Sequence, residues 1–288
     1  MAFSLRAVLP ATSSLAGFTQ LPVCSSPLCP RPPSLWQRWW ARNEGIWLEE
    51  RWYCSRECFH SALLRELLQI SLAPPRPRRA PNRVPLGLVL LSRAEITSRQ
   101  LREALAMQKS AKSGKIGEWL VRMGAVAEEQ VTSALARQQA CPLFSSREPA
   151  AVPAALRWAE GLVRRYRALP VFYNEGRDSL YVGFLDQLDH GFLYAVERML
   201  RCRAEPCIVP LACYRRALDW LSFEAGPQTI EMRQRQSAAG IAEMVENYAQ
   251  QIRAEDCGMS VCDRDLWIRL QPHQSMPVDF LMPLPLAS

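Results

Sequence analysis

Residues 85–138 carry one pattern twice, as PLGLVLLSRAEITSRQLREALAMQ at 85–108 and KIGEWLVRMGAVAEEQVTSALARQ at 115–138. The two 24-residue copies align without a gap, 30 positions apart. Each contains a short apolar run, a turn near Ala94 or Gly124, and a longer run with apolar residues at helical spacing. Such self-similarity predicts a repeated structural unit. We expect each copy to form a short helix followed by a long one, and the copies to pack with approximate two-fold symmetry.

The two copies resemble the N-terminal domain of the assembly ATPases of type II secretion and type IV pili. In the members that bind cyclic di-GMP, a tandem motif begins Arg-Leu-Gly and closes on Gln. The second copy keeps this pattern, with Lys115 in place of the Arg, whereas the first has Pro85 at that position and Ala94 where a second Gly is expected. The resemblance implies a shared fold and a cyclic di-GMP site formed by Leu86, Gly87, Gln108, Lys115, Ile116, Gly117 and Gln138.

The chemistry of cyclic di-GMP suits such positions. A glycine beside an aliphatic residue lets the backbone approach a guanine or a phosphate closely, and the free amides at a helix N-terminus receive a phosphate. Lys115 can pair with a phosphate but stacks on guanine less well than Arg. Pro85 can do neither, although Arg83 is two residues away and could compensate. We expect the two copies to contact the ligand unequally, with the second copy contributing most of the affinity for cyclic di-GMP.

The resemblance continues beyond the repeats and covers about 83–222. The sequence pattern of the family is visible in RYRALPVF, LYVGFLDQLD and AEPCIVPLACYRRALDWL. Helical and strand patterns alternate here, which predicts a small α/β unit. Its expected elements are a helix at 153–166, strands at 168–173 and 180–184 in a hairpin, a helix at 190–200, a strand at 205–209 and a helix at 211–221.

Four cysteines near the start of the chain form two pairs, Cys24 with Cys29 and Cys54 with Cys58. The second pair follows aromatic residues and leads into a helical pattern, where Ser55 is placed to cap the helix. Four thiolates in two pairs suit tetrahedral zinc, and the Tyr-Cys-Ser-x-x-Cys knuckle resembles that of small zinc fingers. A segment of about 35 residues is too small to form a stable core without a bound metal or a comparable cross-link. We therefore expect a structural zinc ion bound by these four residues.

Alternatives remain open for the cysteines. The four thiols could stay reduced without a metal, or His60 could replace one ligand. A second metal or redox cluster could form from Cys202, Cys207, Cys213, Cys257 and Cys262. A buried strand explains Cys207 equally well, because cysteine behaves as a small apolar residue in a core.

The whole sequence predicts an α+β multidomain chain. In order, we expect a disordered tail at 1–23, a zinc-finger-like segment at 24–70, a Pro/Arg-rich linker at 71–84, the helical repeat domain at 85–144, the small α/β unit at 151–222, a helix and strand extension at 228–270 and a disordered tail at 271–288. In the extension, a polar helix at 231–253 precedes a hairpin that ends in a strand at 266–270.

Charge and hydropathy narrow the class of protein. The net charge of +7 comes almost wholly from arginines that are scattered along the chain, which favours a solvated surface over a nucleic-acid groove. No apolar run approaches the 18 residues typical of a transmembrane helix. We expect a cytoplasmic protein that neither inserts into a membrane nor binds nucleic acid.

Enzymatic activity is not expected. The sequence lacks G-x-x-x-x-G-K-[ST], the phosphate loop of the ATPase that follows this domain in secretion motors. The histidines His60, His190 and His273 show no hydrolase or metal pattern. The sequence and the resemblance together favour a non-catalytic regulatory or adaptor protein of bacterial secretion or pilus systems that senses cyclic di-GMP. One alternative is a ligand-free module that docks on a secretion or pilus ATPase or on its inner-membrane platform, and another is a zinc-finger protein that binds nucleic acid.

Overall fold

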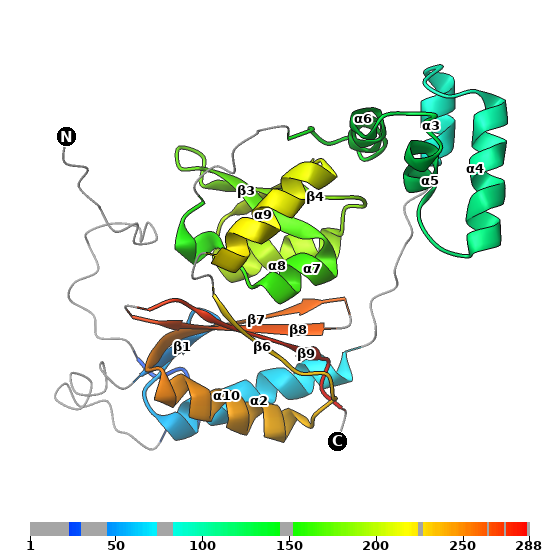
Figure 1. The fold of residues 1–288 in the computed structure, drawn as a ribbon. Coiled ribbons are helices and arrows are strands. Elements are labelled where there is room, and N and C mark those ends of the chain that lie inside the picture. Colours follow the sequence, from blue (N-terminus) through cyan, green and yellow to red (C-terminus); the bar gives the residue numbers. More distant parts are fainter. Residues whose placement is uncertain are drawn as a thin grey trace, which may run out of the picture.

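The computed structural model describes residues 23–29, 45–73, 83–144, 152–223, 227–263, 265–273 and 275–286. Residues 1–22 of the predicted tail, 30–44 of the zinc-finger-like segment and 74–82 of the linker lie outside this part of the chain. Figure 1 shows the described elements as a large sheet with two helices below it, a smaller α/β unit above it and a helical unit to one side. The α+β class is confirmed.

The larger sheet combines two strands from residues 46–53 with four strands from residues 228–283. Its strand order is β2-β1-β7-β8-β9-β6. The short strands β1 (Ile46–Leu48) and β2 (Arg51–Tyr53) form a hairpin, and β1 pairs in parallel with β7 (Ala254–Cys262). The antiparallel strands β8 (Asp265–Pro272) and β9 (Val278–Pro283) follow β7. The cysteine-containing segment and the C-terminal extension, expected as separate parts, are thus one structure.

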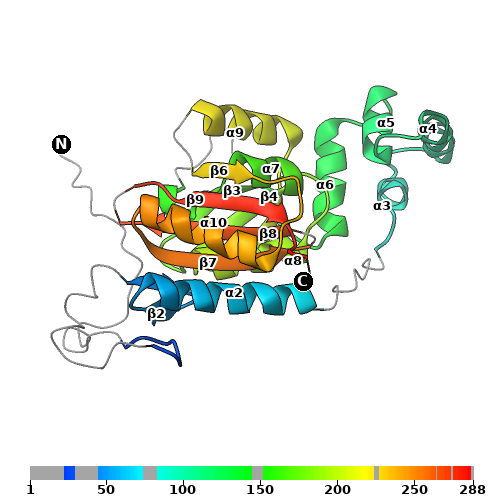
Figure 2. The ribbon, with the colours of Figure 1, turned by 90° about the horizontal axis from the view of Figure 1, so that it is seen from below.

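Two helices, α2 (Arg56–Leu72) and α10 (Ala238–Gln251), cover one face of this sheet and lie side by side (Figures 1 and 2). Strand alternation explains how the sheet serves two cores. In β8, Leu266 and Ile268 face α2 and α10, whereas Trp267 between them belongs to the core on the opposite face. The sheet is therefore buried on both sides.

The α/β unit follows the predicted order of elements from the first strand onward. Its sheet has the order β3-β4-β5, antiparallel between the first two strands and parallel between the last two. Its helices α7 and α8 lie between this sheet and the larger one (Figure 1). The elements are α7 (Glu160–Tyr166), β3 (Ala168–Asn174), β4 (Ser179–Phe184), α8 (His190–Leu200), β5 (Arg203–Ile208) and α9 (Leu211–Phe223).

A buried ion pair explains why the helix predicted at 153–166 does not form as one piece. A 3-10 turn covers Ala154–Leu156, and α7 begins only at Glu160. The side chain of Arg269, paired with Asp279, donates to the carbonyl oxygens of residues 155 and 157, and Asp279 accepts from the amide of residue 159. These main-chain groups are therefore bonded to β8 and β9 instead of to a continuing helix.

Two further predictions near the C-terminus were wrong. Residues 228–231 form strand β6 (Gln228–Glu231) beside β9, and the following helix begins only after Ser237, whose hydroxyl accepts from the Gly240 amide. The tail predicted as disordered at 271–288 contains β9, which is almost wholly buried. Strand β6 depends on a partner distant in sequence, since Gln228 pairs with Val278 of β9, and a local pattern does not reveal such a partner. Strand β9 also forms a hairpin with β8, which directly precedes it.

The repeats form four helices, α3 (Leu86–Ser92), α4 (Ser98–Ala111), α5 (Ile116–Arg122) and α6 (Glu128–Gln138), as predicted. Both turns take the left-handed conformation, at Ala94 with φ 58° and at Gly124 with φ 67°. The short helix of each copy packs against the long helix of the other, α3 on α6 and α5 on α4. Among the described residues, no helix is both long and apolar enough to cross a bilayer.

Candidate functional site

The four predicted zinc ligands come together. The Sγ atoms of Cys24, Cys29, Cys54 and Cys58 lie within 4.8 Å of one another. Ser25 anchors the first pair, because its amide donates to the carbonyl oxygen of Trp52 in β2 at 2.8 Å. The second pair is held by the start of α2, where the Ser55 hydroxyl caps the helix by accepting from the Cys58 amide.

The spacing of these thiols fits a tetrahedral metal. Zinc–sulfur bonds of about 2.3 Å place the four sulfurs of a tetrahedral site roughly 3.8 Å apart, and the Cys29 and Cys54 sulfurs are 3.5 Å apart. Burial and the neighbouring thiols of Cys29 and Cys24 raise the pKa of the Cys54 thiol. A divalent cation at the centre would reverse this effect, since it stabilises the thiolates that otherwise repel one another.

The alternative ligand His60 is used elsewhere. Its Nδ1 lies 2.6 Å from a carboxylate oxygen of Glu246 in α10, and Arg56 of α2 pairs with the other oxygen. This cluster joins α2 to α10. The exposed surface of α2 carries both Arg65 and Glu57, so it is not the uniformly basic face that a nucleic-acid backbone requires.

The five remaining candidate cysteines do not assemble into a second metal site. Cys257 lies in the core beneath α2 and α10, whereas Cys202, Cys207 and Cys262 belong to the core on the other side of the large sheet. Burial raises the pKa of Cys202 and of Cys207 to about 12. Within the described ranges, the cluster at Cys24–Cys58 is the group that could hold a metal.

The closing glutamine of each repeat copy bonds to the entrance of the other copy. The Nε2 of Gln108 donates to the carbonyl oxygen of Gly114 at 2.9 Å, and the Nε2 of Gln138 donates to that of Val84 at 2.6 Å. Residues 84 and 114 are equivalent at the repeat offset of 30, so the two bonds are related by the internal symmetry. These glutamines hold the two copies together.

The repeat glycines also serve packing within the unit. A Cβ on Gly87 would lie 2.6 Å from a methyl group of Leu101, and one on Gly117 would lie 2.8 Å from a methyl group of Val131. Both glycines are buried. Besides its contact with the other copy, each short helix also touches the long helix of its own copy, α3 on α4 and α5 on α6, and the glycines lie at these contacts. Their Cα atoms therefore face protein side chains, and not the open surface that we expected a ligand to approach.

Lys115 joins the repeat unit to the α/β unit. Its Nζ lies 2.6 Å from Oδ2 of Asp186, which follows β4, and the Nε of Arg167 lies 2.8 Å from the same oxygen. The Lys115 side chain is 51% exposed, so it offers a surface to solvent, whereas the Asp186 oxygen that both cations share is itself buried. Nothing in the sequence indicated Arg167 or Asp186, because only the tertiary structure brings them to the repeat.

The chain is similar to solved structures of MshE and XpsE. The structure of MshE with cdg is 28% identical, with the match covering 48% of this chain and 99% of that chain, at a TM-score of 0.39. The XpsE N-terminal domain is 18% identical over 50% of this chain and 96% of that chain, at a TM-score of 0.37. No protein-family profile and no curated protein matches the chain.

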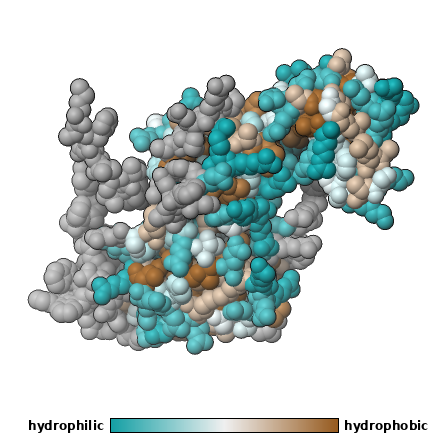
Figure 3. All heavy atoms as spheres, in the orientation of Figure 1, coloured by the Kyte–Doolittle hydropathy of each residue, from teal (hydrophilic) through white to brown (hydrophobic). Residues whose placement is uncertain are grey.

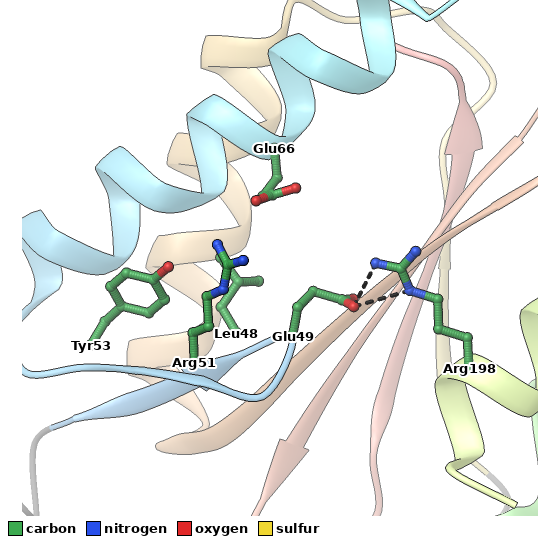
Figure 4. A pocket seen from close by; sticks show the side chains of 6 residues that line it. All are labelled: Leu48, Glu49, Arg51, Tyr53, Glu66 and Arg198. Carbon is green, nitrogen blue, oxygen red and sulfur yellow. Dashed lines mark hydrogen bonds and ion pairs between the residues drawn. The ribbon is translucent and has the colours of Figure 1, made fainter. Parts of the chain in front are cut away.

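A small hollow lies where the N-terminal hairpin, α2 and α8 meet, as shown in Figure 4. Glu49, in the left-handed turn between β1 and β2, accepts from Arg198 of α8 at 2.6 Å and from the Met259 amide at 2.5 Å. The volume of about 210 Å³ is below the usual range for a ligand pocket. Its central ion pair ties the hairpin to the α/β unit.

Proposed function

We propose that this chain is a non-catalytic adaptor whose second repeat copy senses cyclic di-GMP. The observation that carries the proposal is the triad of Lys115, Asp186 and Arg167, in which one carboxylate neutralises two cations on different structural units. A phosphate is the same kind of partner for Lys115 as the Asp186 carboxylate. A ligand phosphate would therefore compete with Asp186, and ligand binding would loosen the contact between the repeat unit and the α/β unit.

Arg83 adds support on the side of the first copy. Its Nη1 is buried and has no hydrogen-bond partner among the described residues. A buried guanidinium nitrogen without a partner is costly, and an anion would satisfy it. This is the residue that could compensate for Pro85. The remaining residues of the proposed site are Leu86, Gly87, Gln108, Ile116, Gly117 and Gln138. Of these, the two glycines and the two glutamines would support the site through the packing and hydrogen bonds described above.

The cysteine cluster has a structural part in this proposal. Zinc would supply a charged centre that holds four thiolates at fixed positions. Cys24 and Cys29 would then anchor the start of the described chain to the β1–β2 hairpin and to α2, on which the edge of the large sheet depends. The metal is assigned no catalytic part.

Calorimetric titration of the full chain with cyclic di-GMP tests the sensing role. We expect Lys115→Ala to weaken binding about ten- to a hundredfold, which corresponds to the loss of one charge-assisted contact of roughly 1.5–3 kcal/mol. Asp186→Asn is expected to strengthen binding, because it removes the competing carboxylate, and Pro85→Arg is expected to strengthen it by restoring the cation of the first copy. Arg137→Glu, an exposed charge change elsewhere in the second copy, is the control and should leave affinity unchanged.

A second candidate function is favoured by the glutamine and glycine contacts described above. Because Gln108, Gln138, Gly87 and Gly117 are all engaged within the unit, the repeats could be a docking module that needs no nucleotide. Absence of binding by both the unchanged chain and Pro85→Arg would decide for this module. A secretion or pilus ATPase, or its inner-membrane platform, is the partner class that the sequence resemblance implies.

A further inference from the structure

The two long helices of the repeat unit occupy equivalent positions, but the rest of the described chain covers only one of them. In α6, Ala136 is 5% exposed and belongs to the core of the α/β unit, and Leu135 packs against that core. The chain after α6 extends this contact, since the Phe144 amide donates to the carbonyl oxygen of Ile208 in β5. Figure 1 shows α6 beside the α/β unit and α4 on the far side of the repeats.

The corresponding face of α4 lies open. Residues 105 and 106, equivalent to 135 and 136, are again leucine and alanine, yet both are exposed, and Leu105 is 46% exposed. Helical spacing places Arg102 and Lys109 on the same side of α4 as this pair. We call Arg102, Leu105, Ala106 and Lys109 the α4 outer face. It corresponds residue by residue to the surface with which α6 docks.

The two faces differ in charge. The α6 positions that flank the Leu-Ala pair hold the neutral residues Thr132 and Gln139, which are buried or half-buried. The same positions in α4 hold Arg102 and Lys109, both exposed and without a carboxylate partner among the described residues. The nearest acidic residue along the helix, Glu103, pairs with Arg99 on another side of α4. The α4 outer face thus keeps the apolar centre of a docking surface and surrounds it with cations.

We propose that the α4 outer face binds an acidic amphipathic segment of a partner protein. Apolar side chains of that segment would cover Leu105 and Ala106, and carboxylates beside them would pair with Arg102 and Lys109. A second copy of this chain is a poor occupant, because it carries the same net charge of +7. A nucleic-acid backbone would match the cations but would leave the apolar centre without a matching surface. In Figure 3, apolar and hydrophilic residues are mixed over the visible side of the repeat unit.

This inference adds a surface and a partner class to the proposed adaptor role, and it rests on that role only in requiring a protein partner. Lys115 and Asp186 are not in the α4 outer face. Loss of nucleotide binding and loss of binding at α4 are therefore separate results, obtained with different variants and different probes.

Fluorescence anisotropy with the full chain tests the proposal. The probe is a labelled synthetic peptide that forms an amphipathic helix, with leucines along one face and glutamates on both sides of them. We expect it to bind the unchanged chain, and we expect Arg102→Glu with Lys109→Glu, or Leu105→Ser alone, to weaken binding about tenfold or more. Circular dichroism melting of each variant checks that it is folded. We expect the variants to fold, because the replaced side chains are exposed. Arg137→Glu and Leu88→Ser, which change an exposed cation and an exposed leucine elsewhere in the unit, should bind like the unchanged chain.

Several results would overturn the proposal. One is failure of the peptide to bind, and another is equal binding of a control peptide with serines in place of its leucines, which would reduce the effect to charge alone. Self-association of the chain that Leu105→Ser abolishes would make a second copy the occupant. Binding of a DNA oligonucleotide that Arg102→Glu with Lys109→Glu abolishes, together with no binding of the acidic peptide, would assign the face to nucleic acid.

Discussion

At the scale of single residues, the repeat contains a matched pair of turns that differ in one methyl group. Ala94 and Gly124 both have positive φ, and a Cβ added to Gly124 would meet no atom within 4 Å, so backbone strain alone separates them. An L-residue in this conformation costs roughly 1 kcal/mol relative to glycine. We therefore expect Ala94→Gly to raise the free energy of unfolding and Gly124→Ala to lower it, each by about 1 kcal/mol, as measured by urea denaturation. Gly176→Ala, at a site with φ not positive and only ordinary contacts, is the control. A change of the same sign in both turns would contradict the explanation.

At the scale of elements, the cysteine cluster brings residues 23–29 together with the end of the hairpin and the start of α2. We expect the purified protein to contain about one zinc ion per chain, and Cys54→Ser to lose it, as measured by elemental analysis. Removing the metal with a chelator should lower the thermal midpoint, because the β1–β2 edge of the large sheet then loses its anchor. Zinc content should also fall as the pH is lowered, since protons compete with the metal for the thiolates. Cys213→Ser, outside the cluster, should retain the metal. Metal content unchanged in Cys54→Ser would refute the assignment.

At the scale of the whole molecule, buried polar contacts join the α/β unit to the large sheet. The Asp279 carboxylate accepts from Arg269, from the Trp267 indole and from the Ala159 amide, and its side chain has no exposed surface. Replacing Asp279 by Ala leaves the Arg269 charge buried without its carboxylate, which typically costs about 3–5 kcal/mol. We expect the thermal midpoint of both units to fall together in calorimetry. Glu255→Ala, which breaks an exposed pair with His273, should change it little. Separate transitions, with only one displaced by Asp279→Ala, would show that these contacts do not couple the units.

The sequence by itself determined the parts whose information is local. The repeat pattern predicted the four helices and both turns, and the paired cysteines beside the Ser55 cap predicted the cluster of four thiols. Helix periodicity and helix caps act over a few residues, so one stretch of chain contains the whole signal. The α/β unit was predictable from β3 onward for the same reason.

Only the tertiary structure decided which distant segments share a sheet and which repeat residues remain exposed for binding. Strand β6 and the first half of the helix predicted at 153–166 depend on partners in β8 and β9, and the ion pair of Lys115 depends on Asp186 after β4. The contrast between Leu105 and Leu135 is of the same kind. Both are leucines at one position of the same motif, but only the packing of α6 against the α/β unit covers one of them. Burial depends on what packs against a side chain in space, and a local pattern does not contain that information.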